Sequence, residues 1–348
     1  MRVVVVGASG NTGTSLLSAL GADPQVTSVL GVARRRPTLE FPKTTWETAD
    51  IASDDLTPLF RGADAVVHLA WLIQPSHDLE RLRRTNVEGS ARLFRAVGDA
   101  GVSALVHASS VGAYSKGPKD RAVGESWPTD GVASSFYGRH KAEVERRLDA
   151  FERNHSDVRV VRMRPGLLFK RDAASGIRRL FAGPFLLEPL AHPSVLRLVP
   201  NVPDLRFQAL HTDDAAAAYR LALVNDVRGA FNVAAEPVLD PPTLARILRA
   251  RTFRFPARAA RALALASWKL HVQPTPPGWL DLARAVPIMD TSRARTELGW
   301  TPARSADDAL LELLSGIRDG AGLETPPLTN RRSRGEEVLT GVGATERA

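Results

Sequence analysis

Short apolar runs alternate with longer amphipathic segments along the first half of the chain. The apolar runs, rich in β-branched residues, cover residues 2–6, 28–33, 44–47, 65–69, 104–108 and 159–164. Amphipathic segments with helical spacing cover residues 12–20, 82–100 and 137–154. Several apolar runs have no polar face, which is typical of buried parallel strands. The alternation predicts an α/β protein with a doubly wound parallel sheet.

The pattern changes after Pro165, where proline and leucine become dense between residues 183 and 203. A strand at 207–210, a helix at 213–224 and a strand at 230–233 predict a further β-α-β unit. Further helices are predicted at 241–248, 257–269 and 306–317. From residue 320 to residue 348 the chain is polar with few large apolar groups, which predicts a disordered tail.

These segments divide the chain into two interleaved parts. We expect the sheet domain to take residues 1–166 and about 207–235. A smaller, mostly helical substrate lobe would take residues 167–206 and 236–319.

Composition excludes several classes of protein. The 348 residues contain no cysteine, which rules out disulfide scaffolds, thiolate metal sites and cysteine nucleophiles. No apolar run reaches the roughly 20 residues that span a bilayer, so we expect a cytoplasmic protein without a membrane span. The net charge of +8 is scattered among acidic residues, and we expect no nucleic-acid partner.

A glycine-rich turn, Gly7-Ala8-Ser9-Gly10-Asn11-Thr12-Gly13, lies between the first predicted strand and the first helix. Glycine lets the backbone approach a pyrophosphate, and the free amides of a helix N-terminus attract that anion. The alternative is a tight strand-to-helix turn without a ligand. Because strand and helix both flank the turn, we predict dinucleotide binding in a Rossmann-type domain.

The second predicted strand ends in Arg34, Arg35 and Arg36, where a carboxylate for a ribose 2′-hydroxyl would be expected. Guanidinium groups suit a 2′-phosphate, so the pattern favours NADP over NAD. NAD remains open, because three arginines can also simply solvate a loop.

Tyr137 and Lys141 are one helical turn apart and therefore share a face. An ammonium beside a phenol lowers the phenol's pKa and makes it usable as an acid or base. Ser109 and Ser110 follow the predicted strand 104–108, at the edge of the sheet where ligands of α/β proteins bind. The spacing alone is also compatible with an ordinary surface helix.

In their order along the chain, these motifs resemble the extended short-chain dehydrogenase/reductase family, which includes NAD-dependent epimerases and dehydratases. The resemblance covers about residues 1–318. The matching segments are 7–13, Ala49-Asp50-Ile51, His68-Leu69-Ala70, Asn86-Val87-Glu88-Gly89, Ala108-Ser109-Ser110 with Tyr114, 137–141, Arg164-Pro165-Gly166, His211-Thr212-Asp213-Asp214, Asp290-Thr291-Ser292 and Glu297-Leu298-Gly299-Trp300.

The resemblance implies roles for individual residues. Ser110, Tyr137 and Lys141 would be catalytic, with Ser110 binding the substrate oxygen, Tyr137 moving its proton and Lys141 holding the cofactor ribose. The cofactor would contact Gly7, Ser9, Gly10, Asn11, Thr12, Gly13, Arg34, Arg35, Asp50, Ile51, Leu69, Ala70, Asn86, Ser109, Tyr137, Lys141 and Pro165. Candidate substrate residues are Trp71, Glu125 and Arg206; Trp71 can equally cap the core, and Glu125 can equally be a loop carboxylate.

The function predicted is an NAD(P)-dependent oxidoreductase that interconverts a secondary alcohol and a ketone by hydride transfer. A nucleotide-sugar epimerase or dehydratase with the same groups is the alternative, and a non-catalytic NADP-binding regulator is a third. An apolar pocket is expected at Phe181, Phe185, Leu186, Leu187 and Leu190, which favours a less polar substrate. Arg178, Arg179 and Arg206 are available for a diphosphate, although no pattern selects them.

The eight histidines form no His-x-His or His-x-x-x-His pair near carboxylates, so no metal site is expected. The expected partner is a small-molecule substrate, and a homodimer is left open.

Overall fold

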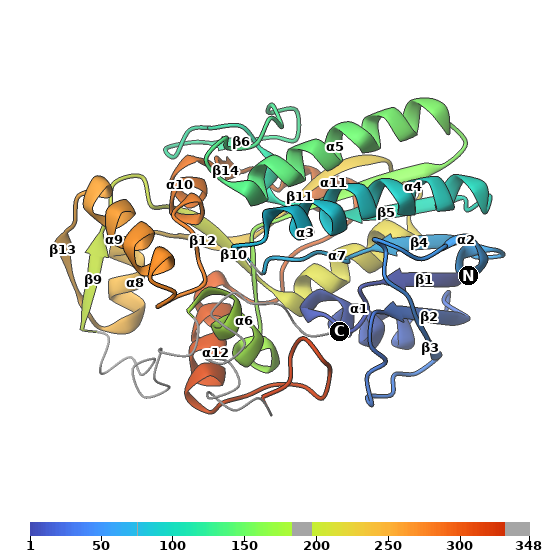
Figure 1. Cartoon of the computed structure of the whole chain (residues 1–348), viewed down its shortest axis with the longest axis horizontal. Coiled ribbons are helices and arrows are strands. Elements are labelled where there is room, and N and C mark those ends of the chain that lie inside the picture. Colours follow the sequence, from blue (N-terminus) through green and yellow to red (C-terminus); the bar gives the residue numbers. More distant parts are fainter. Residues whose placement is uncertain (75, 183–196, 331–348) are drawn as a thin grey trace.

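A computed structural model describes residues 1–74, 76–182 and 197–330 (Figure 1). Its centre is a seven-stranded parallel sheet with the order β11-β7-β5-β4-β1-β2-β3. The strands are β1 (Arg2–Val6), β2 (Ser28–Ala33), β3 (Thr44–Thr48), β4 (Ala65–His68), β5 (Ala104–Ala108), β7 (Arg159–Pro165) and β11 (Gly229–Val233). The order reverses between β1 and β4, and ligands of doubly wound sheets bind at such a point. The predicted sheet is confirmed.

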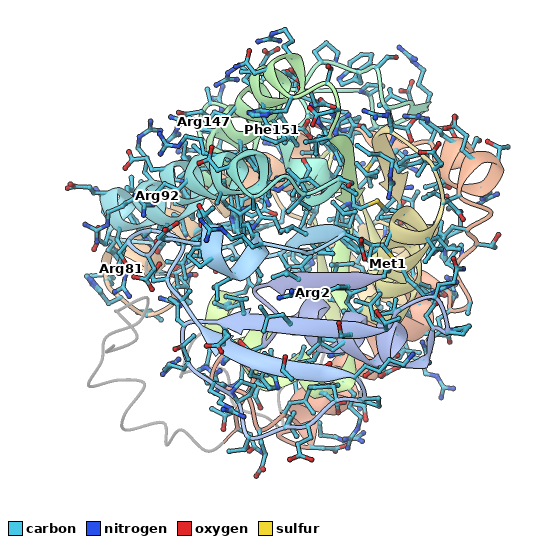
Figure 2. All side chains as sticks on the ribbon, turned by 90° about the vertical axis from the view of Figure 1, so that its right-hand side faces the viewer. Met1, Arg2, Arg81, Arg92, Arg147 and Phe151 are labelled. Atoms are coloured by element: carbon cyan, nitrogen blue, oxygen red, sulfur yellow. The ribbon has the colours of Figure 1, made fainter. Side chains whose placement is uncertain are left out.

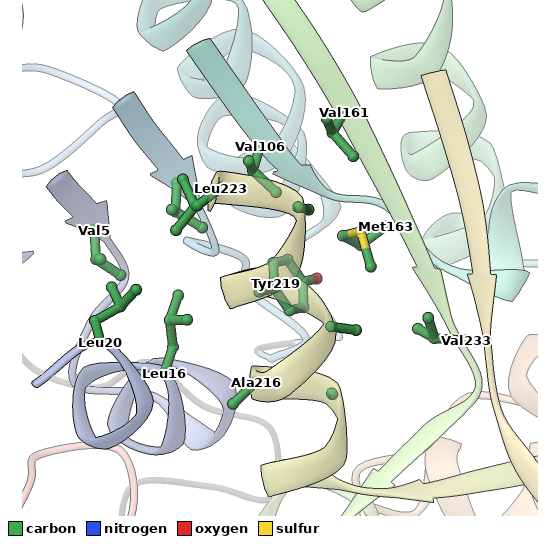
Figure 3. Close-up of a cluster of buried hydrophobic side chains, with 14 of the residues drawn as sticks. Val5, Leu16, Leu20, Val106, Val161, Met163, Ala216, Tyr219, Leu223 and Val233 are labelled. Atoms are coloured by element: carbon green, nitrogen blue, oxygen red, sulfur yellow. The ribbon is translucent and has the colours of Figure 1, made fainter. Parts of the chain in front are cut away.

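Both faces of the sheet are covered, because β1, β2, β4, β5 and β7 each contribute side chains to two cores. Val3 and Val5 of β1 join one core, and Val4 and Val6 join the other. The first core contains α1 (Asn11–Ala22) and α7 (Thr212–Val224); Figure 3 shows Leu16 of α1 and Tyr219 of α7 in it. This double burial is the reason that the strands appear as continuous apolar runs.

The second core lies under α2 (Thr57–Phe60), α4 (Ser90–Asp99) and α5 (Phe136–Asn154). Arg92 of α4 and Arg147 of α5 lie on this helical side of the molecule (Figure 2). The apolar faces of these helices therefore pack on the sheet while much of their charge faces outward.

The single helix predicted at 82–100 is divided. It consists of α3 (Leu79–Arg83), a π-helical turn (Arg84–Gly89) and α4. A Cβ at Gly89 would lie 2.8 Å from the Ile51 side chain, and the Asn86 side chain binds the backbone of Leu72. The wider turn accommodates both contacts, as π-bulges near functional sites do.

The second part of the chain forms small sheets and helices. β8 (Leu167–Phe169), β10 (Phe207–His211) and β12 (Ala235–Leu239) form a three-stranded sheet. β9 (Leu198–Asn201) pairs with β13 (Arg251–Arg254), and β6 (Ala122–Val123) pairs with β14 (Ile288–Met289). The helices are α6 (Ala174–Phe181), α8 (Pro241–Leu248), α9 (Ala257–Lys269), α10 (Gly278–Ala285), α11 (Ser292–Glu297) and α12 (Ala306–Arg318).

The predicted β-α-β unit at 207–233 is therefore wrong in one respect. β10 lies in the three-stranded sheet, whereas β11 is an edge strand of the seven-stranded sheet. β10 pairs in parallel with β8 and antiparallel with β12, so its backbone is paired on both sides outside the large sheet.

Residues 320–330 are packed against the protein, which corrects the prediction that the tail is disordered from residue 320. Thr325 and Leu328 are buried. Arg179 donates hydrogen bonds to the carbonyl oxygens of Pro327 (2.7 Å) and Thr329 (2.6 Å). Thr38 donates to the carbonyl of Glu324 (3.4 Å), so this segment connects α6 with the loop after β2. Residues 331–348 of the predicted tail lie outside the described residues.

Candidate active site

The glycine-rich turn joins the end of β1 to the start of α1. Gly7 has φ +87°, and a Cβ there would lie 2.6 Å from the amide nitrogen of Ala70. A Cβ at Gly13 would lie 2.4 Å from the carbonyl oxygen of Ala8, so glycine lets α1 pack closely on the turn. Gly10 caps α1 without a side-chain hydrogen bond, and the helix N-terminus therefore offers its amides to an anion.

A cavity opens beside this turn at the carboxyl ends of β1, β2 and β4. It holds about 1160 Å³ of space, part of it open to solvent. Eight of the predicted cofactor residues line it: Gly7, Ser9, Gly10, Arg34, Asp50, Ile51, Leu69 and Ala70. Trp71, predicted for the substrate, also lines it, as do Arg81 and Arg179.

The other predicted cofactor residues lie outside the cavity wall: Asn11, Thr12, Gly13, Arg35, Asn86, Ser109, Tyr137, Lys141 and Pro165. Asn86 does not line the cavity, but it holds Leu72, which does. Its side chain accepts a hydrogen bond from the Leu72 amide and donates one to the Leu72 carbonyl, each 2.7 Å long. It therefore fixes the loop 71–74 along the cavity.

A set of hydrogen bonds joins α1 to the region around β8, and we call this set the seam. Asn11 belongs to it. Its side-chain amide donates to the carbonyl of Leu168 (3.3 Å). The ammonium of Lys170, which follows β8, donates to the hydroxyls of Thr14 (2.8 Å) and Ser15 (3.1 Å). Ser15 in turn donates to Asp213 at the start of α7 (2.6 Å). Asn11 is thus structural in this arrangement.

Ser110 and Tyr137 come together from the end of β5 and the first turn of α5. Ser135 caps α5 by accepting a hydrogen bond from the Gly138 amide. Ser110 accepts a hydrogen bond from the Gly112 amide (3.0 Å) and is hydrogen-bonded to Tyr137. A Cβ at Gly112 would lie 2.7 Å from Cε1 of Tyr137, so glycine is needed where the phenol ring passes.

Lys141 is buried one turn beyond Tyr137, but its ammonium points elsewhere. The Nζ atom donates to the carbonyl of Ala108 (2.7 Å) and lies 3.5 Å from the ring centre of Trp71. It is 5.8 Å from the ring centre of Tyr137. Burial lowers the pKa of Lys141 to about 7, and Glu145 opposes this shift.

Burial raises the pKa of Tyr137 to about 12, although the hydrogen bond with Ser110 acts to lower it. The expectation that Lys141 lowers the pKa of Tyr137 is therefore wrong for this structure. The ammonium is held by Ala108 and Trp71, and the desolvated phenol keeps its proton.

Aromatic rings surround the phenol of Tyr137. Trp71 meets it edge-on with ring centres 5.8 Å apart, and Trp279 lies at 4.7 Å. Phe181 packs against Trp279 with ring centres 5.1 Å apart. Trp279 was missed by the sequence analysis, and no local pattern points to it. Phe185, Leu186, Leu187 and Leu190 of the expected apolar pocket lie outside the described residues.

A buried ion pair between Glu145 and Arg164 adjoins the candidate site at Ser109. Glu145 accepts hydrogen bonds from Arg164 (2.9 and 3.0 Å) and from Ser109 (2.5 Å). Burial acts to raise the pKa of Glu145, but the bonds from Arg164 outweigh it and the pKa is lowered. Ser109 is therefore occupied by Glu145. Glu145 lies one turn after Lys141, a spacing that the sequence analysis did not use.

The two remaining candidate substrate residues make contacts within the protein. The Glu125 carboxylate accepts a hydrogen bond from the Asn232 amide (2.9 Å). Arg206 donates to the carbonyl of Lys119 (2.6 Å). Neither residue lines the cavity.

Within the described ranges, no group of histidines and carboxylates is arranged to hold a metal ion. In the same ranges, no helix is long and apolar enough to cross a membrane.

Comparisons with known proteins find relatives in sequence and in fold. The uncharacterized protein Mb2073c of Mycobacterium bovis is 27% identical over 93% of this chain. The matched part is 31% of the length of Mb2073c, so this chain spans about a third of that relative. The L-arabinose 1-dehydrogenase (NAD(P)(+)) of Haloferax volcanii is 33% identical over 31% of the chain and 41% of its own length.

Among solved structures, the UDP-glucose-4-epimerase of Stenotrophomonas maltophila with bound NAD and formylated UDP-arabinopyranose is similar in fold. Its TM-score is 0.67 at 21% identity, over 92% of this chain and 98% of that one. The model of the NAD dependent epimerase/dehydratase family matches residues 3–234. The chain therefore belongs to the NAD dependent epimerase/dehydratase family.

Proposed function

We propose that the protein is an NADP-preferring oxidoreductase that interconverts a secondary alcohol and a ketone. The observation that carries the proposal is the convergence of Ser110, Tyr137 and Lys141 next to a cavity with a glycine-rich turn. The proposed roles are Ser110 as ligand of the substrate oxygen, Tyr137 as proton donor or acceptor, and Lys141 as ligand of the cofactor ribose.

The cavity fits a dinucleotide. The close approach of the backbone at Gly7 and the uncapped start of α1 suit a pyrophosphate, and Asp50 and Ile51 also line the cavity. Arg34 lines the cavity after β2, where its charge favours a 2′-phosphate. A bound nicotinamide would supply hydride transfer at the reacting carbon.

In the reducing direction, Tyr137 would be the proton donor. With its pKa raised to about 12, Tyr137 holds a proton at neutral pH that it can donate to a carbonyl oxygen. Ser110 orients that oxygen through its hydroxyl. The oxidising direction requires the phenolate, which Lys141 would favour by turning its ammonium from Trp71 toward the phenol.

The surroundings of Tyr137 support a substrate of low polarity. Trp71 and Trp279 present ring faces and edges there. Arg179, available for a diphosphate, donates to two backbone carbonyls of the 320–330 segment. Arg206 is likewise bonded to a carbonyl and lies outside the cavity wall.

A nucleotide-sugar epimerase is the second candidate. It uses the same three groups, and the fold similarity to the Stenotrophomonas maltophila epimerase extends over most of both chains. A regulator that binds NADP without catalysis is the third, and the intact Ser110, Tyr137 and Lys141 argue against it.

The test is to assay the purified protein for consumption of NADPH with a panel of ketones, in parallel with conversion of UDP-sugars. Oxidation of NADPH that depends on an apolar ketone supports the reductase. Conversion of a UDP-sugar without net change in cofactor supports the epimerase, and tight NADP binding without either reaction supports the regulator.

A further inference from the structure

The helix α9 is the least buried helix of its length in the described chain. None of its residues is buried. Ala259, Leu263, Ala266 and Leu270 follow helical spacing and form one outward apolar stripe, with Leu263 63% and Leu270 74% exposed. An exposed apolar stripe of this kind has an energetic cost in water unless something covers it.

Other exposed apolar side chains lie at the same end of the molecule. Phe253 of β13 and Val272 after α9 are 42% and 45% exposed, and Leu198 of β9 is 63% exposed. β13 pairs with β9, so these strands and α9 occupy one end of the molecule, opposite β1–β3 (Figure 1). We call the surface formed by Phe253, Leu263, Leu270 and Val272, with Arg258 and Lys269, the α9 face.

The same region carries most of the excess positive charge of the chain. Residues 241–280 contain seven lysine and arginine residues and no aspartate or glutamate, against a net charge of +8 for the whole chain. Arg246 and Arg261 pair with Asp307 and Asp281, outside this segment. The other five have no ion pair within the described residues. Positive charge and exposed leucines therefore occur together.

We propose that the α9 face binds the surface of an anionic lipid bilayer. Interfacial helices combine an apolar face with flanking lysine and arginine, which is the composition of α9. The leucines would enter the acyl boundary, and Arg258 and Lys269 would meet the headgroups. Basic residues near an anionic membrane strengthen binding to it through electrostatic attraction.

A shallow groove runs along α9 and supports a lipid as the occupant. Val202, Phe255, Leu263 and Leu280 line it, and its wall is mainly apolar. Such a groove fits an acyl chain. A symmetric contact with a second copy would bring Arg258 and Lys269 of both copies together, and a nucleic acid would leave the leucines exposed.

The α9 face is also close to the candidate active site. α9 packs against α10, and Trp279 of α10 lies against Tyr137. A protein held on a bilayer by α9 would therefore present α10, and the aromatic wall of the site, near the lipid. Binding to lipid is independent of the proposed function, since it needs no turnover.

The test is flotation of the full-length protein with vesicles of phosphatidylcholine alone and of phosphatidylcholine mixed with phosphatidylglycerol. We expect binding to the mixed vesicles that weakens with salt. The double variant Leu263→Asp/Leu270→Asp should lower the partition coefficient at least about tenfold, and so should Arg258→Glu/Lys269→Glu. Leu311→Asp, at a leucine 40% exposed on α12, is the matched control and should bind as the unaltered protein does.

Thermal melting of each variant shows that it is folded. The proposal is overturned if neither double variant weakens vesicle binding, or if Leu311→Asp weakens it equally. It is also overturned if the unaltered protein does not bind the mixed vesicles. Binding to duplex DNA, or a dimer that the leucine variants dissociate, would then identify the other occupant. Activity measured without vesicles tests the proposed function separately.

Discussion

The ammonium of Lys141 lies 3.5 Å from the ring centre of Trp71, which makes the tryptophan its cation–π partner. The same ammonium is bonded to the Ala108 carbonyl. For Lys141 to reach a cofactor ribose, one of these contacts has to be exchanged. Trp71 therefore contacts Lys141 and is also part of the cavity wall.

The buried Lys141 makes stability depend on pH. Its pKa is about 7 in the folded protein, against the ordinary lysine value of 10.5 in the unfolded chain, so between these values the unfolded chain binds the extra proton. Stability from this group therefore rises with pH from about 7 to 10.5, by at most about 1.4 kcal/mol per pH unit. Urea unfolding of the unaltered protein and of Lys141→Met across this range should give curves that diverge. Parallel curves would contradict the shifted pKa.

Tyr137→Phe should reduce turnover by at least about a hundredfold, because it removes the proposed proton donor. Cofactor binding should remain nearly intact, since the ring and its packing are kept. Initial rates and fluorescence titration with NADPH measure the two effects. Tyr219→Phe is the matched control, because Tyr219 is a buried phenol of the core in Figure 3. Unchanged turnover in Tyr137→Phe would disprove the catalytic role.

Arg34→Ala should weaken NADP binding about tenfold or more and leave NAD binding unchanged, because a charge-assisted bond to a 2′-phosphate is lost. Calorimetric titration with both cofactors measures this. Arg36→Ala is the control, since Arg36 does not line the cavity. The cofactor assignment fails if the unaltered protein binds NAD more tightly than NADP.

Gly7→Ala should destabilise the protein by about 1–3 kcal/mol and abolish cofactor binding, because its φ is +87° and the new Cβ would collide with Ala70. At Gly10 a Cβ would meet only the Gly7 carbonyl oxygen, at 3.4 Å. Gly10→Ala should therefore keep its stability. Equal unfolding midpoints for the two variants would show that the turn relaxes.

Strands and turns whose structure depends on residues close together in the chain could be predicted from the sequence. The valine run of β1 is apolar on both faces, so it predicted a buried parallel strand, and the glycine-rich turn predicted a dinucleotide site where the cavity lies. The apolar residues of β10 predicted a strand but not its sheet, because any paired and buried strand has that pattern. The partners of β10 are set by contacts distant in sequence.

The candidate site likewise has features that local spacing predicted and features that it could not predict. The spacing of Tyr137 and Lys141 predicted that they share one face of α5, and it could not predict which group the ammonium contacts. That choice depends on Ala108 and Trp71, which come from other elements. Trp279 reaches Tyr137 only because α10 packs at the start of α5, where a Cβ at Gly278 would lie 2.4 Å from the Ser134 carbonyl oxygen.

The seam between α1 and the β8 region constrains how a ligand can enter and leave. Lys170, Asn11 and Ser15 tie the first helix to β8 and α7 by hydrogen bonds that are partly or fully buried. The other walls are held as well, by the bonds of Asn86 to Leu72 and by those of Arg179 to Pro327 and Thr329. A wider opening of the cavity would therefore require some of these hydrogen bonds to break.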